Sequence, residues 1–342
     1  MFREWEAELR RKIIWWENFR DDNTVEPEFW INWDVKISDY GVPSVRHRTS
    51  GDGSFVWDSP IKDLDKDFDK LKMRTYAVDR KKTEETARLA NEIFGDLLPS
   101  RIIGSYWWTL GLTQDAIFLV GLENLMLYMY DNPEGVHRLM AYLRDNALKL
   151  VNWVEKEKLL THWNKNQYVG SGGVAYTDEL PQKDWKEGMS VRLKDRWGFA
   201  ESQETVEVSP EQFGEFVFPY QLPLLSKFGL NCYGCCEPVD KRLKYILQIP
   251  NLRRVSVSPW ANQDICAEKL KGIAVFSRKP NPSLLSASFN EDELRKDLRS
   301  TLEAAKSIRN QTELIMKDTH TCGRDIARFT KWVKLAYEEV GT

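Results

Sequence analysis

The pattern of hydrophobic and polar positions divides the chain into two parts. Residues 2–20 predict an amphipathic helix whose apolar face holds Trp5, Leu9, Ile13, Trp16 and Phe19. Residues 21–80 mix Trp, Pro, Asp and Gly without a clear period, and they are too apolar for a solvated linker. Residues 81–97 fit a helix again. We therefore expect an N-terminal helical and irregular elaboration over residues 1–98, packed on the remainder of the chain.

From about residue 100, short apolar runs alternate with helical patterns. The candidate strands lie in 101–107, 160–173, 195–202, 229–236, 253–259, 273–280 and 313–319. The longest helical patterns cover 118–157 (two helices), 209–229, 238–250, 290–311 and 325–340, with Asn132, Ser209 and Asn290 as expected N-caps. Seven or eight strand–helix units favour a parallel sheet closed into a (β/α)8 TIM barrel over residues 99–342. A dinucleotide-binding GxGxxG and a phosphate-binding P-loop are both missing from the sequence.

Composition narrows the function classes. The chain has 342 residues, with 49 basic and 52 acidic side chains, and a dedicated nucleic-acid binder usually carries a basic excess. No apolar run is long enough to span a membrane, and the charged N-terminus lacks a signal-peptide core. Five cysteines, three of them clustered near residue 235, do not form a secreted disulfide framework. We expect a cytoplasmic protein with reduced thiols.

Reactive side chains follow three of the predicted strands. Glu201 and Glu204 follow one strand, the cysteines at 232, 235 and 236 end another, and residues 318–324 follow the last. In a barrel these segments meet at the carboxyl ends of the strands, where two thiols and a carboxylate suit Zn²⁺ with an open fourth position. The competing interpretation is that the cysteines are small buried hydrophobes.

The run SPEQFGEFVFPYQLPLLSKFGLNCYGCCEPVDKRLKYI at 209–246 resembles the uroporphyrinogen decarboxylase superfamily, and TCGRDIARFTKWVKLA at 321–336 resembles its closing segment. The resemblance covers about residues 100–340 and implies a TIM barrel. The arginine-rich N-terminal signature of porphyrinogen decarboxylases is missing. The resemblance therefore implies the other branch, the cobalamin-dependent methyltransferases, which bind zinc through one early and one late cysteine.

The resemblance assigns Cys322 as the late zinc ligand. Alignment on the strand makes Cys235 the early ligand, whereas the spacing to the following helix makes it Cys236. If the strand continued to this point, the adjacent side chains would face opposite sides and one alone would bind. The family's histidine before the early cysteine is missing, because the chain has Tyr233 or Gly234 there. Candidate third ligands and catalytic groups are Glu201 and Glu204, with Glu237 and His320 in reserve.

The resemblance further implies methyl transfer from a small methylated substrate to the corrinoid of a partner protein, since the chain lacks a cobalamin-binding Asp-x-His-x-x-Gly segment. Fourteen tryptophans favour an aromatic pocket and an aryl methyl ether, that is, O-demethylation. Methylamine and methylcorrinoid-to-thiol transfer, and a metal-free decarboxylase-like or ligand-binding barrel, remain alternatives. Expected substrate contacts are Trp107, Trp108, His162, Asn164, Tyr176, Trp197 and Trp260. The apolar N-terminal segment makes a homodimer a further expectation.

Overall fold

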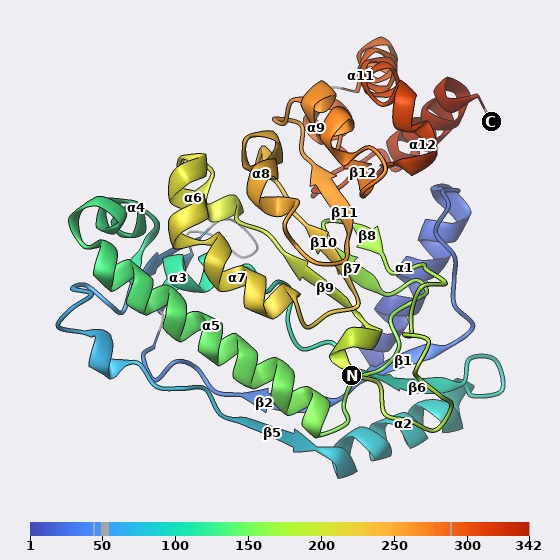
Figure 1. The fold of residues 1–342 in the computed structure, drawn as a ribbon. Helices are drawn as coiled ribbons and strands as arrows, with labels where there is room; N and C mark the ends of the chain where they lie inside the picture. The colour runs from blue at the N-terminus through green and yellow to red at the C-terminus, as the bar shows by residue number, and fades with distance from the viewer. Residues whose placement is uncertain (44, 49–54, 288, 342) are drawn as a thin grey trace.

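The structure is a computed structural model that describes residues 1–43, 45–48, 55–287 and 289–341. Among these residues, five parallel strands form a sheet in sequential order β9 to β13 (Figure 1). The strands are β9 (Trp197–Ala200), β10 (Leu230–Tyr233), β11 (Leu252–Val257), β12 (Val275–Arg278) and β13 (Thr312–Leu314). Strands that follow one another in sequence are therefore hydrogen-bonded neighbours, each reached by a crossover, as the alternation predicted.

A second parallel pair joins the two parts of the chain. β1 (Phe29–Asn32) pairs with β6 (Ser100–Ile103), with Phe29 opposite Ser100. Within the described residues, no ladder connects this pair to the five-stranded sheet. The described strands therefore show a mixed α/β fold with parallel sheets, and closure into a ring of eight stays a prediction.

The expected strand at 160–173 is wrong in form. This region holds a short antiparallel hairpin, β7 (Tyr168–Gly170) with β8 (Gly173–Val174). β7 packs against the edge strand β9 without a hydrogen-bonded ladder between them among the described residues, and an irregular segment also lies beside β9, where Leu110 N donates to Phe199 O at 2.9 Å. Glycine-rich and asparagine-rich stretches have weak strand preference, which explains why the alternation broke down here.

The helices largely follow their predicted positions. They are α1 (Phe2–Asn18), α2 (Arg80–Phe94), α3 (Thr113–Val120), α4 (Leu122–Asp131), α5 (Pro133–Lys156), α6 (Pro210–Phe216), α7 (Phe218–Leu225), α8 (Leu243–Ile246), α9 (Gln263–Leu270), α10 (Ser283–Ser286), α11 (Glu291–Ala304) and α12 (Ala327–Val340). The Asn132, Ser209 and Asn290 side chains cap α5, α6 and α11 as expected. Predicted helix 209–229 is two helices, because the chain breaks at Val217 before Pro219. No described helix is long and apolar enough to cross a bilayer.

The predicted apolar face of α1 is only partly covered. Trp5 and Leu9 pack with Phe29 and the α2 side chains, and Phe19 stacks on Phe329 of α12 at 4.7 Å. Ile13 and Trp16 are 54% and 52% exposed, so they belong to the surface. The described part of the N-terminal region also contains two short antiparallel strand pairs, β2 (Asp34–Ile37) with β5 (Tyr76–Asp79) and β3 (Val45–Arg48) with β4 (Phe55–Asp58).

Each face of the main sheet has its own hydrophobic cluster. Tyr233 and Val255 pack into the large cluster with residues of α5, α6 and α7, which lie to one side of the strands in Figure 1. Phe199 and Cys232 belong to a smaller cluster on the other face, together with Val169 and Cys235. This alternation follows from the two-residue period of a strand. Cys235 lies beyond the end of β10, and its packing with this smaller cluster places it away from α5.

Candidate active site

The candidate site centres on two adjacent cysteines after the carboxyl end of β10. The strand ends at Tyr233, and Gly234 turns the chain with φ +92°. Beyond this turn the alternation of side chains no longer applies, and Cys235 Sγ lies 3.7 Å from Cys236 Sγ. A strand that continued through both cysteines would have let only one of them bind a metal. Because β10 ends before them, that restriction does not apply.

Lys317 and Asp318 approach the thiol pair from the segment after β13. Lys317 Nζ lies 3.5 Å from Cys235 Sγ and 3.2 Å from Cys236 Sγ. Cys236 Sγ lies 3.5 Å from Asp318 Oδ2, and this carboxylate also accepts a hydrogen bond from Lys317. Of the three segments that the sequence placed at one rim, those after β10 and β13 do meet. Asp318 was among the predicted strand-end residues, whereas Lys317 was not.

The electrostatics favour one thiolate. The hydrogen bond from Cys235 and the nearby ammonium of Lys317 lower the pKa of Cys236 to about 7, against the opposing effect of burial. The pKa of Cys235 is raised by the same hydrogen bond and by burial, so Cys235 keeps its proton and donates it to Cys236. Burial opposes the charge of Lys317, but Asp318 and the two thiols outweigh it and raise its pKa. The cluster thus combines a protonated Cys235, a Cys236 that ionises more readily than an ordinary thiol, and the Lys317–Asp318 ion pair.

Buried acidic groups support the loop that carries the thiols. Glu237 Oε2 accepts from Cys235 N at 2.8 Å, and its Oε1 accepts from Ser202 N at 2.8 Å. Glu237 therefore holds together the loops after β9 and β10. The neighbouring Arg242 is also buried and donates to Ser202 Oγ at 2.8 Å. These contacts fix the cysteine backbone on an internal hydrogen-bond network.

Glu201 and Glu204, the predicted catalytic carboxylates, lie on the same network. Glu201 is fully buried, and burial followed by the charges of Glu204 and Glu237 raises its pKa well above the usual value. Its Oε2 accepts from Gln203 N at 2.9 Å, while Oε1 has no hydrogen-bond partner among the described residues. Glu204 accepts from Thr113 Oγ1 at 2.8 Å. No described contact links either carboxylate to a thiol.

His320 and Cys322 lie in the irregular segment between β13 and α12. His320 is exposed and Cys322 is half-buried. Across the described residues, no side-chain hydrogen bond or ion pair connects them to Cys235 or Cys236, and no group of three or more His, Cys, Asp or Glu side chains is arranged to hold a metal ion. The predicted late ligand is on the segment that reaches the thiols, but it is not at the thiols.

The predicted aromatic contacts are spread over several places. Trp107 and Trp108 line a pocket together with Tyr40, Tyr106, Asn146 and Asp115. Trp197 is buried and donates to Ala175 O at 3.1 Å. His162 contacts Trp185 edge to face, and Asn164 donates to Leu180 O. Tyr176 and Trp260 are 43% and 70% exposed. These residues do not make one continuous wall.

Asp115 gives the Trp107–Trp108 pocket a polar group. Its Oδ2 accepts from Tyr40 Oη at 2.8 Å, and burial raises its pKa.

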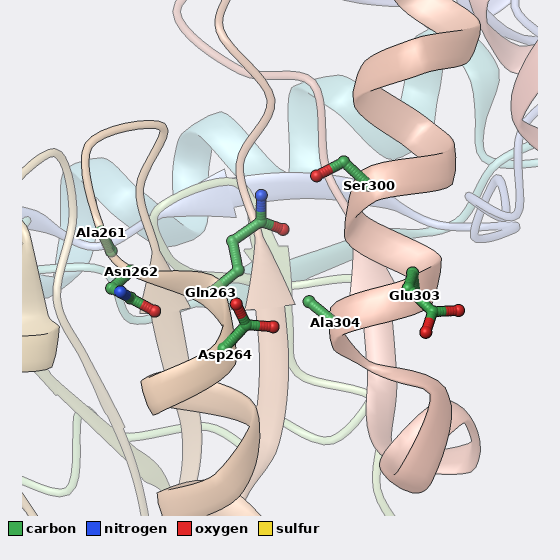
Figure 2. Close-up of a pocket in the computed structure, with 7 residues that line it drawn as sticks. All are labelled: Ala261, Asn262, Gln263, Asp264, Ser300, Glu303 and Ala304. Atoms are coloured by element: carbon green, nitrogen blue, oxygen red, sulfur yellow. The ribbon is translucent and has the colours of Figure 1, made fainter.

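A separate hollow lies between the start of α9 and α11 (Figure 2). It is lined by Ala261, Asn262, Gln263, Asp264, Ser300, Glu303 and Ala304. Its lining contains none of the predicted site residues.

Sequence reasoning also missed a buried lysine at a strand end. Lys279 directly follows β12, is 1% exposed, and donates to Ser277 Oγ. Burial, partly offset by Glu313, lowers the pKa of Lys279 to about 8. Lys279 and Lys317 each follow an observed strand within three residues and lie near the ends of the predicted strands at 273–280 and 313–319, so the strand-end rule that selected the glutamates could have found both lysines.

Comparison with known proteins gives no family assignment. No protein-family model matches the chain, and no curated protein matches it in sequence. Among solved structures, the chain is similar to a methyltransferase from Methanosarcina mazei at 12% sequence identity and a TM-score of 0.44. The alignment covers 75% of this chain and 64% of the other, which is less than two thirds of that protein. A likeness at this level identifies no activity for the chain.

Proposed function

We propose that the chain is a zinc-dependent methyltransferase that takes a methyl group from a small methylated substrate. The observation that carries the proposal is the spacing of the two thiols at the carboxyl end of β10. Two sulfurs bound at about 2.3 Å to one tetrahedral zinc lie about 3.8 Å apart, and Cys235 Sγ and Cys236 Sγ are 3.7 Å apart. The pair therefore fits two positions of a zinc site without rearrangement of the cysteines.

The remaining zinc positions need a movement of the segment after β13. Lys317 Nζ now contacts both sulfurs, and an ammonium cannot remain there beside a bound cation. Displacement of Lys317 would shift the segment that carries Cys322, the third ligand in this proposal. Glu201 and His320 are the alternative third ligands. Zinc in such a site supplies Lewis-acid polarisation of the atom that loses its methyl group.

The residues of the chain have separate tasks in this proposal. Glu237 holds the Cys235 amide and so fixes the thiol loop. Lys317 stabilises the Cys236 thiolate before metal enters, because its ammonium lies 3.2 Å from the sulfur. Glu201 is kept protonated by burial and by two neighbouring carboxylates, so it can donate a proton to a leaving group that reaches it.

The sequence resemblance and the high tryptophan content support the proposed substrate and methyl acceptor. We favour an aryl methyl ether as donor, with O-demethylation as the reaction, and the Co(I) corrinoid of a partner protein as acceptor. A methylamine donor and a thiol acceptor are the alternatives. The proposed scaffold is a (β/α)8 barrel in which β1, β6 and β9 to β13 are seven of the eight strands, and the substrate enters at the carboxyl ends.

Zinc content tests the metal proposal directly. We expect about one zinc per chain by elemental analysis of the purified protein, and loss of most of it in Cys236→Ser and Cys322→Ser. The control is Cys266→Ser, because Cys266 is buried in α9 and has no described contact with the thiol pair. Methyl transfer from aryl methyl ethers and methylamines to a reduced corrinoid protein should fall with the zinc. Unchanged zinc in Cys236→Ser would contradict the ligand assignment.

A metal-free enzyme or binding protein is the second candidate. The contact of Lys317 with both sulfurs favours it, because the same geometry makes Cys236 a reactive thiolate without any metal. In that case the wild-type protein would hold no zinc after purification with zinc present. Alkylation of Cys236 would then abolish activity or ligand binding.

A further inference from the structure

Arg196 is a buried cation without an anionic partner. It directly precedes β9 and is 2% exposed. Within the described residues it forms no ion pair with a carboxylate, and its Nε and Nη1 atoms have no hydrogen-bond partner. Other buried arginines differ: Arg278 donates to Ser258 O, and Arg254 pairs with Glu313 at 2.7 Å. Burial of an unpaired charge destabilises a folded protein, so the position of Arg196 points to an anion that binds there.

Aromatic rings surround the guanidinium but do not satisfy it. The Trp163 ring centre lies 4.1 Å from Arg196 Cζ, and the Trp107 ring centre lies 5.9 Å away. Such contacts stabilise the positive charge through the ring face. The N–H groups point outward in the guanidinium plane and need acceptor oxygens. Burial lowers the pKa of Arg196 to about 9, so the side chain is still charged at neutral pH.

Two further nitrogen atoms beside Arg196 also lack partners. Trp163 Nε1 and His162 Nδ1 are buried and unpaired among the described residues. Burial lowers the pKa of His162, and the charges of Arg101 and Arg196 act in the same direction. A neutral histidine can carry its proton on Nδ1, and indole is always a donor. Unpaired buried donors on three neighbouring side chains match an acceptor with several oxygens.

The position of this cluster separates it from the thiols. Arg196 comes before the first residue of β9, whereas Cys235 and Cys236 come after the last residue of β10, which is parallel to β9. The two groups therefore lie at opposite ends of neighbouring strands. We propose that Arg196, His162 and Trp163 form a binding site for a small oxyanion, a carboxylate or a phosphate, held by the guanidinium fork. This site is independent of the proposed methyl transfer.

Anion binding is tested by the melting temperature of the full chain. The probes are inorganic phosphate and benzoate, titrated at constant ionic strength set with sodium chloride. We expect a saturable rise of about 5 °C at 100 times Kd for the better probe. The tryptophan fluorescence of the chain should change over the same concentration range, and this change should be smaller in Trp163→Phe. The probe with the lower half-saturation concentration, phosphate or benzoate, is the oxyanion that the site prefers.

Variants assign the effect to the cluster. Arg196→Met should abolish the saturable shift, and it should not lower the melting temperature in the absence of probe, because an unpaired buried charge is replaced by an apolar side chain. Trp163→Phe keeps an aromatic ring but removes the indole N–H donor, and should weaken binding about fivefold. Arg88→Met is the control, since Arg88 is an exposed residue of α2 paired with Glu92. No saturable shift in the wild type, or the same shift in Arg196→Met, would overturn the proposal. The zinc content of each variant should equal that of the wild type, because this site is separate from the proposed metal site.

Discussion

Lys317 Nζ lies 3.2 Å from Cys236 Sγ, although 80 residues separate the two in sequence. The contact joins the segments that follow β13 and β10, two strands that are not neighbours in the sheet. It lowers the pKa of Cys236 together with the hydrogen bond from Cys235. This pair therefore controls whether the candidate site presents a nucleophilic thiolate, with or without a metal.

Removal of the Lys317 charge should make Cys236 less reactive. In Lys317→Met we expect the pKa of Cys236 to rise by about 1 unit from its value of about 7, because an adjacent ammonium favours the thiolate. The measurement is the pH dependence of iodoacetamide alkylation, followed by mass spectrometry at Cys236 after removal of metal with EDTA. Lys194→Met is the control, since Lys194 pairs with the exposed Asp184 instead. An unchanged midpoint would show that Lys317 does not act on the thiol.

Glu201 should make the protein less stable as pH rises. Burial raises its pKa in the folded state, so the folded chain holds a proton that the unfolded chain releases above pH 4.5. The stability that this proton contributes is fully present below pH 4.5 and is lost progressively as the pH rises through the raised pKa of Glu201. Glu201→Gln cannot ionise at this position. The difference in unfolding free energy between Glu201→Gln and the wild type should therefore shift in favour of the variant from pH 5 to pH 8. Urea denaturation at each pH measures this difference.

The control for Glu201 is Glu211→Gln on α6. A hydrogen bond from Lys244 lowers the pKa of the exposed Glu211, so the sign of any pH effect is opposite to that of Glu201. A Glu201→Gln difference that did not grow with pH would mean that Glu201 is ionised in the folded protein. In that case it could not act as the proton donor proposed above.

Gly234 should be needed for the geometry of the thiol pair. It has φ +92°, and a Cβ at this position would lie 3.0 Å from Val239 Cγ1. Gly234→Ala should therefore cost about 1–2 kcal/mol in unfolding free energy and also shift the alkylation profile of Cys236. Gly272→Ala is the matched control, because Gly272 has φ +73° with no atom within 4 Å of the added Cβ. The control should lose stability without any change at Cys236; equal alkylation profiles in both variants would contradict the prediction.

Local patterns predicted the elements best where the chain has strong periodicity and caps. Helices α5 and α11 begin after Asn132 and Asn290, and both side chains accept the expected backbone hydrogen bonds. The strand at 160–173 failed because its polar and glycine residues carry no strand period. The amphipathic pattern of residues 2–20 predicted the α1 helix correctly, but it did not show that Ile13 and Trp16 would be exposed.

The candidate site was predictable only as a set of strand ends. The sequence by itself determined that Cys235, Cys236 and Asp318 lie at the ends of predicted strands, because short apolar runs and their boundaries are local features. Tertiary structure decided that both thiols face the same side, that Lys317 reaches them, and that Arg196 has no counter-charge. These features depend on one turn at Gly234 and on contacts between distant segments. Sequence spacing carries no information on such contacts, since they arise only when the whole sheet is assembled and buried.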